Sequence, residues 1–473
     1  MSEKHGVYTS EQATGISTPV VADVGIPFIV GLAPVQNAEN PATIGKPVLC
    51  NTFSDAVEVL GYSDDWATYP LCMAMYSHFR LFGASPVIFY NCLNPATMNQ
   101  AVAASDMSVS DHKIKLPIEA INDSNLVIKQ AGGTGTAWVK DTDYAVYPAD
   151  GKLVIEFLAD GGHYSAASAN VAYKKVKTSD VTAAVVAAAF DAVDLCITTV
   201  GMIPDLLLAP GFSQDTTVAA AMATKADAIN GMFKAIALVD FDASSVTTAT
   251  AAITAKGTNN WTDKRLVPCW PMCKLDSLAF YTSVLVAGCM ASVDTANGGI
   301  PYESPSNKSL KCASTCLASG AEVIISKADA DRLNAAGIMT ALNFVNGFVA
   351  WGNWTAAHPS VGDVKDAIIP ERRMFDFVSN TLIKTFWYKL DQPMTRRLID
   401  SVLDTANIWL NGLVGAGYLY GARVEMLDDE NPLNDLMQGI IRLHVYMTPP
   451  APAKEIDFIL EYDPEYVTAA LAG

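Results

Sequence analysis

The stretch Asp205-Leu-Leu-Leu-Ala-Pro210, a helical segment around 217–232 and Ala235-Ile-Ala-Leu-Val-Asp240 follow one another in the middle of the chain. Short apolar runs of this kind are typical of strands that are covered on both faces, as in a parallel sheet. Phe28–Gly31 and Pro86–Tyr90 repeat the pattern nearer the N-terminus. Because strands that alternate with helices require right-handed crossovers, we expect an α/β core with a parallel sheet.

The segment from about residue 94 to 180 follows a different pattern. Leu126–Lys129, Asp143–Tyr147 and Lys152–Phe157 predict strands, and Asp150-Gly151 predicts a tight hairpin between the last two. This segment shows no helical period. We therefore expect a small all-β domain, similar to a β-sandwich, inserted into the α/β core.

The C-terminal part of the chain predicts an α+β domain. Glu371–Lys389 and Gln392–Leu413 are expected to be helices, the second with Pro393 in its first turn, and Gly439–Met447 and Glu455–Tyr462 are expected to be strands. We divide the chain into an N-terminal arm (1–24), the first part of the core (25–93), the inserted domain (94–180), the rest of the core (181–360), the C-terminal α+β domain (361–447) and a C-terminal arm (448–473).

The composition restricts the function classes. Charged residues make up 17% of the 473 residues, against about 25% in an average soluble chain, and 31 basic against 49 acidic residues give a net charge of −18. This excludes disorder and argues against direct nucleic-acid binding, which requires a basic surface. The uncharged stretches 277–293, 333–362 and 405–422 contain too many polar residues, or are too short, for membrane spans. Because the start lacks an apolar signal region, we expect synthesis and maturation in a cytoplasm.

No catalytic or metal-binding residue emerges from the sequence, and we expect no cofactor. There is no GxxxxGK[ST] phosphate loop and no GxSxG nucleophile elbow, and no histidine neighbours a serine in a recognisable catalytic pattern. Cys269 and Cys273 lie in an extended segment, where residues four apart are roughly 13 Å apart and cannot share one ion. The nine cysteines are therefore interpreted as reduced, mostly buried thiols.

Both ends of the chain have strand character but cannot build a core of their own. An unpaired strand is a template for pairing with another chain. The alternative, that both arms fold back onto their own domain, remains equally open. The candidate pairing residues are Gly6, Val7, Tyr8 and Glu11 at the N-terminus and Ile456, Phe458, Leu460 and Tyr462 at the C-terminus.

An ordered set of short motifs spans nearly the whole chain and resembles the contractile tail sheath proteins of bacteriophages and phage-tail-like particles. The motifs are His5-Gly6-Val7-Tyr8, Phe28-Ile29-Val30-Gly31-Leu32-Ala33, Gly61-Tyr62, Gly83-Ala84-Ser85-Pro86-Val87, the loop Gly298–Asn307, Trp351-Gly352-Asn353, Ile369-Pro370-Glu371-Arg372-Arg373-Met374-Phe375-Asp376 and Gly439-Ile440-Ile441-Arg442. The resemblance does not explain why the chain contains as many as nine cysteines.

The resemblance implies a subtilisin-like α/β core without protease activity, with the inserted domain on the outer surface. It implies a non-enzymatic subunit that polymerises as stacked six-fold rings around an inner tail tube and contracts to drive the tube through a bacterial envelope. The implied partners are copies of the chain, the tube protein, and baseplate and tail terminator proteins, without nucleic acid or membrane. The implied location is the tail of a virion, or of a phage-tail-like particle, assembled in the host cytoplasm.

The basic residues are concentrated in the C-terminal helices. Six basic and two acidic residues fall between Arg372 and Arg397, which gives +4 within a chain of −18. We hypothesise that part of this stretch, namely Lys384, Lys389, Arg396 and Arg397, faces the tube; intramolecular salt bridges are the alternative explanation. The sheath of a headless bacteriocin-like particle or injection system is an alternative function, another self-assembling shell protein is a further one, and a cytoplasmic α/β hydrolase is a more distant one.

Overall fold

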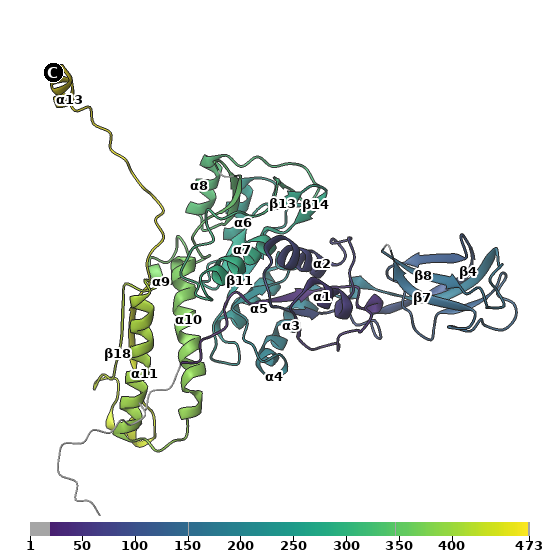
Figure 1. Ribbon diagram of the computed structural model, residues 1–473, viewed down its shortest axis with the longest axis horizontal. Coiled ribbons are helices and arrows are strands. Elements are labelled where there is room, and N and C mark those ends of the chain that lie inside the picture. Colours follow the sequence, from purple (N-terminus) through teal and green to yellow (C-terminus); the bar gives the residue numbers. More distant parts are fainter. Residues whose placement is uncertain (1–18, 150, 346, 472–473) are drawn as a thin grey trace, which may run out of the picture.

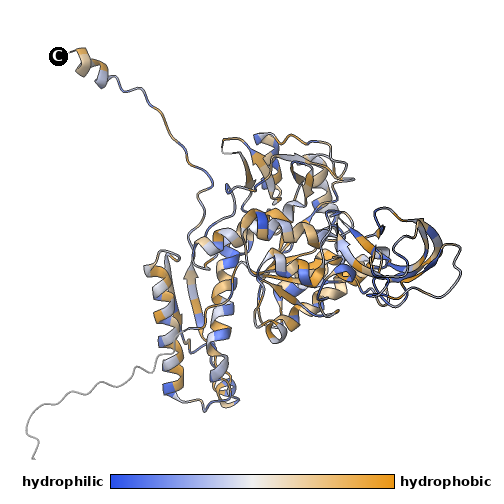
Figure 2. Ribbon diagram, turned by 45° about the vertical axis from the view of Figure 1, so that its right-hand side comes forward, coloured by the Kyte–Doolittle hydropathy of each residue, from blue (hydrophilic) through white to orange (hydrophobic). Residues whose placement is uncertain are grey.

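The structure is a computed structural model that describes residues 19–149, 151–345 and 347–471. Figure 1 shows a central α/β part with a β-rich part on one side and a pair of long helices on the other, from which the C-terminal segment extends. Figure 2 shows that hydrophobic residues gather at the strands of the central part.

The central part is built on a six-stranded sheet with the order β12-β11-β10-β1-β3-β2. All neighbouring strands are parallel except β2 and β3. This confirms the predicted parallel sheet, since each predicted strand lies within two residues of an observed one; the short β2 was not predicted. The strands are β1 (Pro27–Gly31), β2 (Val48–Cys50), β3 (Val87–Asn91), β10 (Leu206–Leu208), β11 (Ile236–Asp240) and β12 (Leu266–Cys269).

Helices cover both faces of this sheet. The helices α2 and α7 contact one face and α3 and α5 the other. The uncharged stretch 277–293 falls largely in α7, whose residues are mostly buried against the sheet, which explains its composition without a membrane. The helices are α1 (Phe53–Leu60), α2 (Pro70–Met75, continued by a π-helix at Tyr76–Phe82), α3 (Ala183–Ala189), α4 (Cys196–Thr199), α5 (Thr216–Asp227), α6 (Ala249–Thr258), α7 (Thr282–Ala296) and α8 (Lys327–Ala335).

Small elements complete the core. A three-stranded sheet has the order β14-β13-β15, and β16 and β17 form an antiparallel pair. Where the structure is described, none of its helices is both long and apolar enough to cross a membrane. The bounds are β13 (Met272–Leu275), β14 (Leu278–Phe280), β15 (Ser314–Cys316), β16 (Thr340–Asn343) and β17 (Phe348–Trp351), with 3-10 turns at Val35–Asn37, Thr178–Asp180 and Phe190–Leu195.

The β-rich part consists of two three-stranded antiparallel sheets around an apolar cluster of its own. The strands predicted from Leu126, Asp143 and Lys152 onward are confirmed. Two strands were missed: Asn99–Ser108 is mostly exposed and gives little apolar alternation, whereas Lys113–Pro117 alternates over only five residues. The strands are β4 (Asn99–Ser108), β5 (Lys113–Pro117), β6 (Val127–Gln130), β7 (Tyr144–Ala149), β8 (Lys152–Phe157) and β9 (Ser168–Val176).

The C-terminal part packs two long helices against a two-stranded sheet over a third apolar cluster. The helix predicted from Gln392 starts later, at Arg396, because the Thr395 side chain accepts the Leu398 N–H and caps it there, which leaves Pro393 outside. The strand predicted from Gly439 starts only at His444. The elements are α9 (Val364–Ala367), α10 (Ile369–Phe386, then a 3-10 turn at Trp387–Lys389), α11 (Arg396–Gly415), β18 (Gly421–Glu425), α12 (Leu433–Met437), β19 (His444–Thr448) and α13 (Glu465–Leu471).

Candidate assembly surfaces

The first described residues run along α10 and are fixed to it by side chains of that helix. The Thr385 hydroxyl accepts the Val20 N–H at 3.0 Å, and the Thr381 hydroxyl accepts the Ala22 N–H at 3.0 Å. Lys384 donates to the Asp23 carboxylate at 3.0 Å. The candidate pairing residues of the N-terminal arm lie outside the described residues. They are Gly6, Val7, Tyr8 and Glu11.

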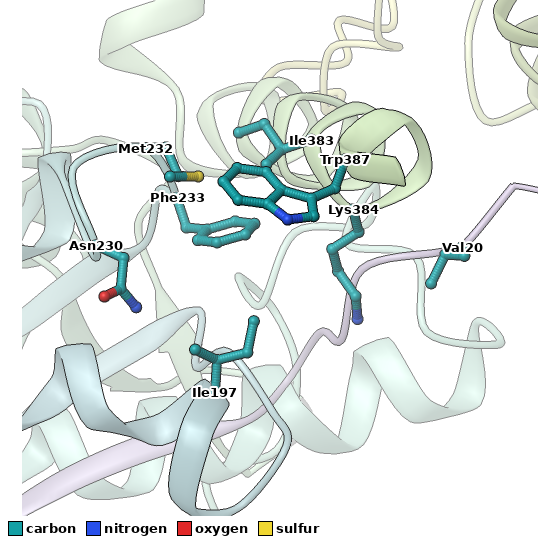
Figure 3. Close-up of a pocket in the computed structure, with 8 residues that line it drawn as sticks. All are labelled: Val20, Ile197, Asn230, Met232, Phe233, Ile383, Lys384 and Trp387. Atoms are coloured by element: carbon teal, nitrogen blue, oxygen red, sulfur yellow. The ribbon is translucent and has the colours of Figure 1, made fainter. Parts of the chain in front are cut away.

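A hollow of about 470 Å³ lies beside this attachment, and apolar side chains dominate its lining. In the view of Figure 3, the rings of Trp387 and Phe233 lie beside each other, and Ile197 lies on the opposite side of the hollow. Trp387 is 58% exposed, although tryptophan side chains are on average highly buried. The lining residues are Val20, Ile197, Asn230, Met232, Phe233, Ile383, Lys384 and Trp387.

The C-terminal arm, residues 448–473, contacts the rest of the chain at Lys454 and is extended after it. The Lys454 ammonium lies 4.0 Å from the centre of the Trp354 ring, which in turn stacks on His358 at 3.9 Å. Beyond this contact Phe458 and Leu460 are 85% and 93% exposed. Residues 455–462 pair with no other strand in the described chain, so the predicted strand is absent from the single subunit. Pairing of Ile456, Phe458, Leu460 and Tyr462 with another copy stays a prediction.

The basic stretch is divided between the interior and the surface. Arg372 and Arg373 are buried, so the hypothesis of a surface patch does not extend to them. Lys384 is largely buried and paired with Asp23. Lys389 lies 5.0 Å from the centre of the Tyr388 ring, and Arg396 donates to Asp400 at 2.9 Å. Arg397 is exposed, and no ion pair to it is found within the described residues.

The buried arginines connect α10 to the core sheet. Arg373 donates to Asp294 of α7 at 3.1 Å and to Asp205, just before β10, at 2.7 Å. Burial raises the pKa of Asp294 to about 6 even though Arg373 opposes the shift. Because each charge has a partner within hydrogen-bond distance, the network joins the C-terminal helices rigidly to the core.

A second set of buried ion pairs involves Arg372, the neighbour of Arg373 on α10. Arg265, just before β12, donates to Asp376 of α10 at 2.6 Å, and Arg372 donates to Asp376 at 3.0 Å. Burial raises the pKa of Asp376, although both guanidinium groups lower it. Local sequence patterns missed this network because its members are far apart in the chain; the unusual run Glu371-Arg372-Arg373 in an apolar helix was the only available signal.

The hydrolase alternative finds no support in the geometry. His78 is buried, its Nδ1 lies 3.0 Å from the Ala74 carbonyl oxygen, and burial lowers its pKa to about 4. Asp240, at the end of β11, receives hydrogen bonds from Ser213 and Ser283, but in the part of the chain that is described no histidine contacts any of the three. These contacts cap the first turn of α7, which is a structural role.

The cysteines behave as buried small side chains. Eight of the nine are buried and the ninth is half-buried, as predicted, and all are free. Burial raises the pKa of Cys50 and of Cys92 to about 12, so these thiols stay protonated and unreactive at neutral pH. Within the described ranges no group of three or more His, Cys, Asp or Glu side chains is arranged to hold a metal ion.

No family model matches the sequence, whereas individual proteins do. The chain is 26% identical to the tail sheath protein of Burkholderia phage BcepMu, over 99% of this chain and 98% of that protein. It is 29% identical to the major tail sheath protein of Serratia phage KSP20, over 31% of this chain and 35% of that protein.

Solved structures of sheath assemblies share the fold at low sequence identity. The sheath complex of an extracellular contractile injection system, PVC, in the contracted state superimposes with a TM-score of 0.60 at 15% identity, over 98% of this chain and 99% of that one. The contracted helical sheath of the anti-feeding prophage gives 0.58 at 16%, over 98% and 100%. Over nearly its full length this chain is thus similar to a phage tail sheath protein, and it shares the mixed α/β fold of the solved sheath assemblies.

Proposed function

We propose that this chain is the polymerising subunit of a contractile tail sheath, forming stacked six-fold rings around an inner tube and shortening to drive the tube through a bacterial envelope. The observation that carries the proposal is the match to a phage tail sheath protein over 99% of the chain. Its role is structural, since the relatives are named as sheath proteins.

The proposed architecture assigns one role to each segment. The core, residues 25–93 and 181–360, has a subtilisin-like arrangement without protease activity, which the parallel sheet and the missing histidine partner of Asp240 support. The inserted domain, 94–180, lies on the outer surface, and residues 361–447 form the C-terminal α+β domain. The arms, 1–24 and 448–473, join neighbouring subunits, which the exposed apolar residues of the second arm support.

The proposed partners are further copies of the chain, the tube protein, and baseplate and terminator proteins of a virion tail assembled in the host cytoplasm. On the tube-facing side we place Lys389, Arg396 and Arg397, which lie at the end of α10 and the start of α11. Lys384 contributes less, because Asp23 already neutralises it. The sheath of an injection system is the second candidate, because the solved structures with this fold include one named as such.

Electron microscopy of the purified chain tests the proposal. The full chain should form hollow helical tubes, whereas deletion of Glu455–Gly473 or of Met1–Gly15 should leave a folded, soluble subunit that forms none. Circular dichroism and a thermal melt of each variant establish that the subunit is folded. Ordered tubes from both deletion variants contradict the role of the arms, and a full chain that stays monomeric at every concentration and salt level, with tube protein present, contradicts the proposed function.

A further inference from the structure

An open hollow of about 460 Å³ lies where α6 and α8 pack on each other, near the C-terminal ends of both helices (Figure 1). Pro359 and Ser360 complete its wall. Lys256 and Arg332 are its two basic residues, and among the described residues no aspartate or glutamate lines it. The hollow therefore concentrates positive charge in a chain whose net charge is −18.

Lys256 is the buried cation of this chain that lacks a carboxylate. Four basic side chains of the described chain are buried, and the other three, all arginines, are each paired with aspartates. Lys256 is 7% exposed, and no carboxylate lies within ion-pair distance of it in the described residues. Its ammonium instead donates to the Ala336 carbonyl at 2.6 Å and to the His358 carbonyl at 2.5 Å.

These two contacts leave the Lys256 ammonium incompletely paired. Because Ala336 directly follows the last residue of α8, the first contact also caps that helix. An ammonium has three N–H donors, however, and the two carbonyls accept only two of them. Burial lowers the pKa of Lys256 to about 8, so the charged form is disfavoured in the single subunit. A carboxylate in the hollow would accept the third N–H and supply the missing negative charge.

The rim of the hollow is uncharged where the 333–362 stretch borders it. That stretch contains no Asp, Glu, Lys or Arg, and Ala335, Pro359 and Ser360 are exposed at the rim. Gly257 borders the hollow from α6, and a Cβ at this position would meet no described atom within 4 Å, so the approach from solvent is open. An uncharged rim around a buried charge is typical of interfaces that exclude water from a central contact.

We propose that this hollow receives a carboxylate side chain of a second copy of the chain, which accepts the remaining N–H of Lys256 while Arg332 attracts it during approach. A second copy is the partner because the proposed function surrounds each subunit with copies, and 49 acidic against 31 basic residues leave every copy with an excess of carboxylates. This inference rests on the proposed function, and it adds a contact between neighbouring bodies that is independent of both arms.

Arg332 has the secondary role in this contact. Its side chain is 53% exposed and already donates to Asp329 at 3.4 Å and to Thr250 at 2.7 Å. It therefore contributes long-range attraction at the rim, which salt screens. Arg332→Gln should slow tube formation about two- to fivefold at low salt and leave it unchanged at high salt. An unchanged rate at low salt overturns the role of Arg332.

Matched substitutions of Gly257 test the charge of the partner without altering the cap of α8. Gly257→Glu and Gly257→Gln place side chains of the same size at the open wall, and both should fold because each residue is a better helix former than glycine. Gly257→Glu should require a concentration at least about tenfold higher than Gly257→Gln for tube formation, because it places a negative charge where a negative partner docks. Equal concentrations overturn the assignment of an acidic partner.

Zero-length cross-linking of the unmodified chain identifies the carboxylate. A carbodiimide activates a carboxyl group, and a lysine amine in contact with it forms an amide while the activating group leaves as a urea. Tubes assembled from isotope-labelled and unlabelled chains should yield Lys256 joined to an Asp or Glu of the other copy, as measured by peptide mass spectrometry. The dispersed subunit should yield no such product. Lys256 that is unlinked in the tube, or linked only within one copy, overturns the inference.

The same experiment separates this inference from the proposed function. If the unmodified chain forms tubes in which Lys256 is unlinked, the acidic contact is wrong and the sheath function stands. If the chain forms no tubes at any salt level with tube protein present, the proposed function is wrong, and the contact between copies is refuted with it.

Discussion

The two ends of the basic stretch between Arg372 and Arg397 have opposite environments. Arg372 and Arg373 are 8% and 4% exposed, and each is held by two carboxylates. The Arg396 side chain is 82% exposed and pairs only with its helix neighbour Asp400 in the described structure. The same residue type therefore fixes α10 to the core at one end and lies exposed on the surface at the other. The two environments differ in whether the acidic partner is itself buried, as Asp294 is, or exposed, as Asp400 is. The local density of charges in the sequence does not separate them.

The largest effect is expected from Arg373→Met, which keeps the volume and removes the charge. Asp294 would then be buried without a partner, which costs about 3–5 kcal/mol of unfolding free energy. Chemical denaturation at pH 7 measures this. Arg397→Met is the matched control and should change the stability by less than about 0.5 kcal/mol. Similar losses in the two variants would remove the distinction between the two ends.

The sequence predicted the sheet because apolar runs such as Leu206–Leu208 and Ile236–Asp240 carry their signal locally. It did not predict the ion-pair network, because Arg373 pairs with Asp294 and Asp205, which are 79 and 168 positions away. Such pairs depend on how the crossovers place α7 and β10 beside α10. Counting the charged residues in one stretch of sequence therefore finds the arginines but not the distant aspartates that neutralise them.

The candidate pairing surfaces were likewise predicted only in part from the sequence. The arm residues from Ile456 to Tyr462 were recognised by their alternation and are exposed. Asn407 lies within the helix predicted from Gln392 to Leu413, but its contact with Val424 depends on how β18 folds back along α11.

The next effect concerns a buried carboxylate, Asp240, for which the described part of the chain provides no cationic partner. Burial raises the pKa of Asp240 to about 6, whereas in the unfolded chain it titrates near its usual value of 3.8. Between pH 4 and 6 the folded state therefore binds more protons, so raising the pH favours unfolding. The stability of the parent relative to Asp240→Asn should fall by about 1–3 kcal/mol over this interval. Groups common to both proteins cancel in the difference, and a difference that stays constant with pH would contradict the assignment.

Lys384 lies between the two extremes and should give an intermediate result. Its side chain is 19% exposed and its partner Asp23 24% exposed. Lys384→Met should cost about 1 kcal/mol, because a partly buried pair is lost while the methionine still covers the apolar hollow. Thermal unfolding measures the change, and Lys389→Met serves as the control, since no ion pair to Lys389 is found within the described residues. Assembly should be less affected than by deletion of an arm, since Val20 and Ala22 remain bonded to Thr385 and Thr381.

Charge reversal at Arg396 and Arg397 should have the smallest effect on the stability of the chain. It should nevertheless clearly weaken the attachment of the sheath to the tube. Both side chains are exposed at the start of α11, so Arg396→Glu with Arg397→Glu should change the unfolding free energy by less than about 1 kcal/mol. If this end faces the tube, reversal replaces attraction by repulsion and fewer tubes should be sheathed at low salt, with the difference from the parent shrinking as salt screens it. Cosedimentation of subunit and purified tube measures this. Normal sheathing at low salt would place the tube contact elsewhere and leave the exposed arginines as ordinary surface charge.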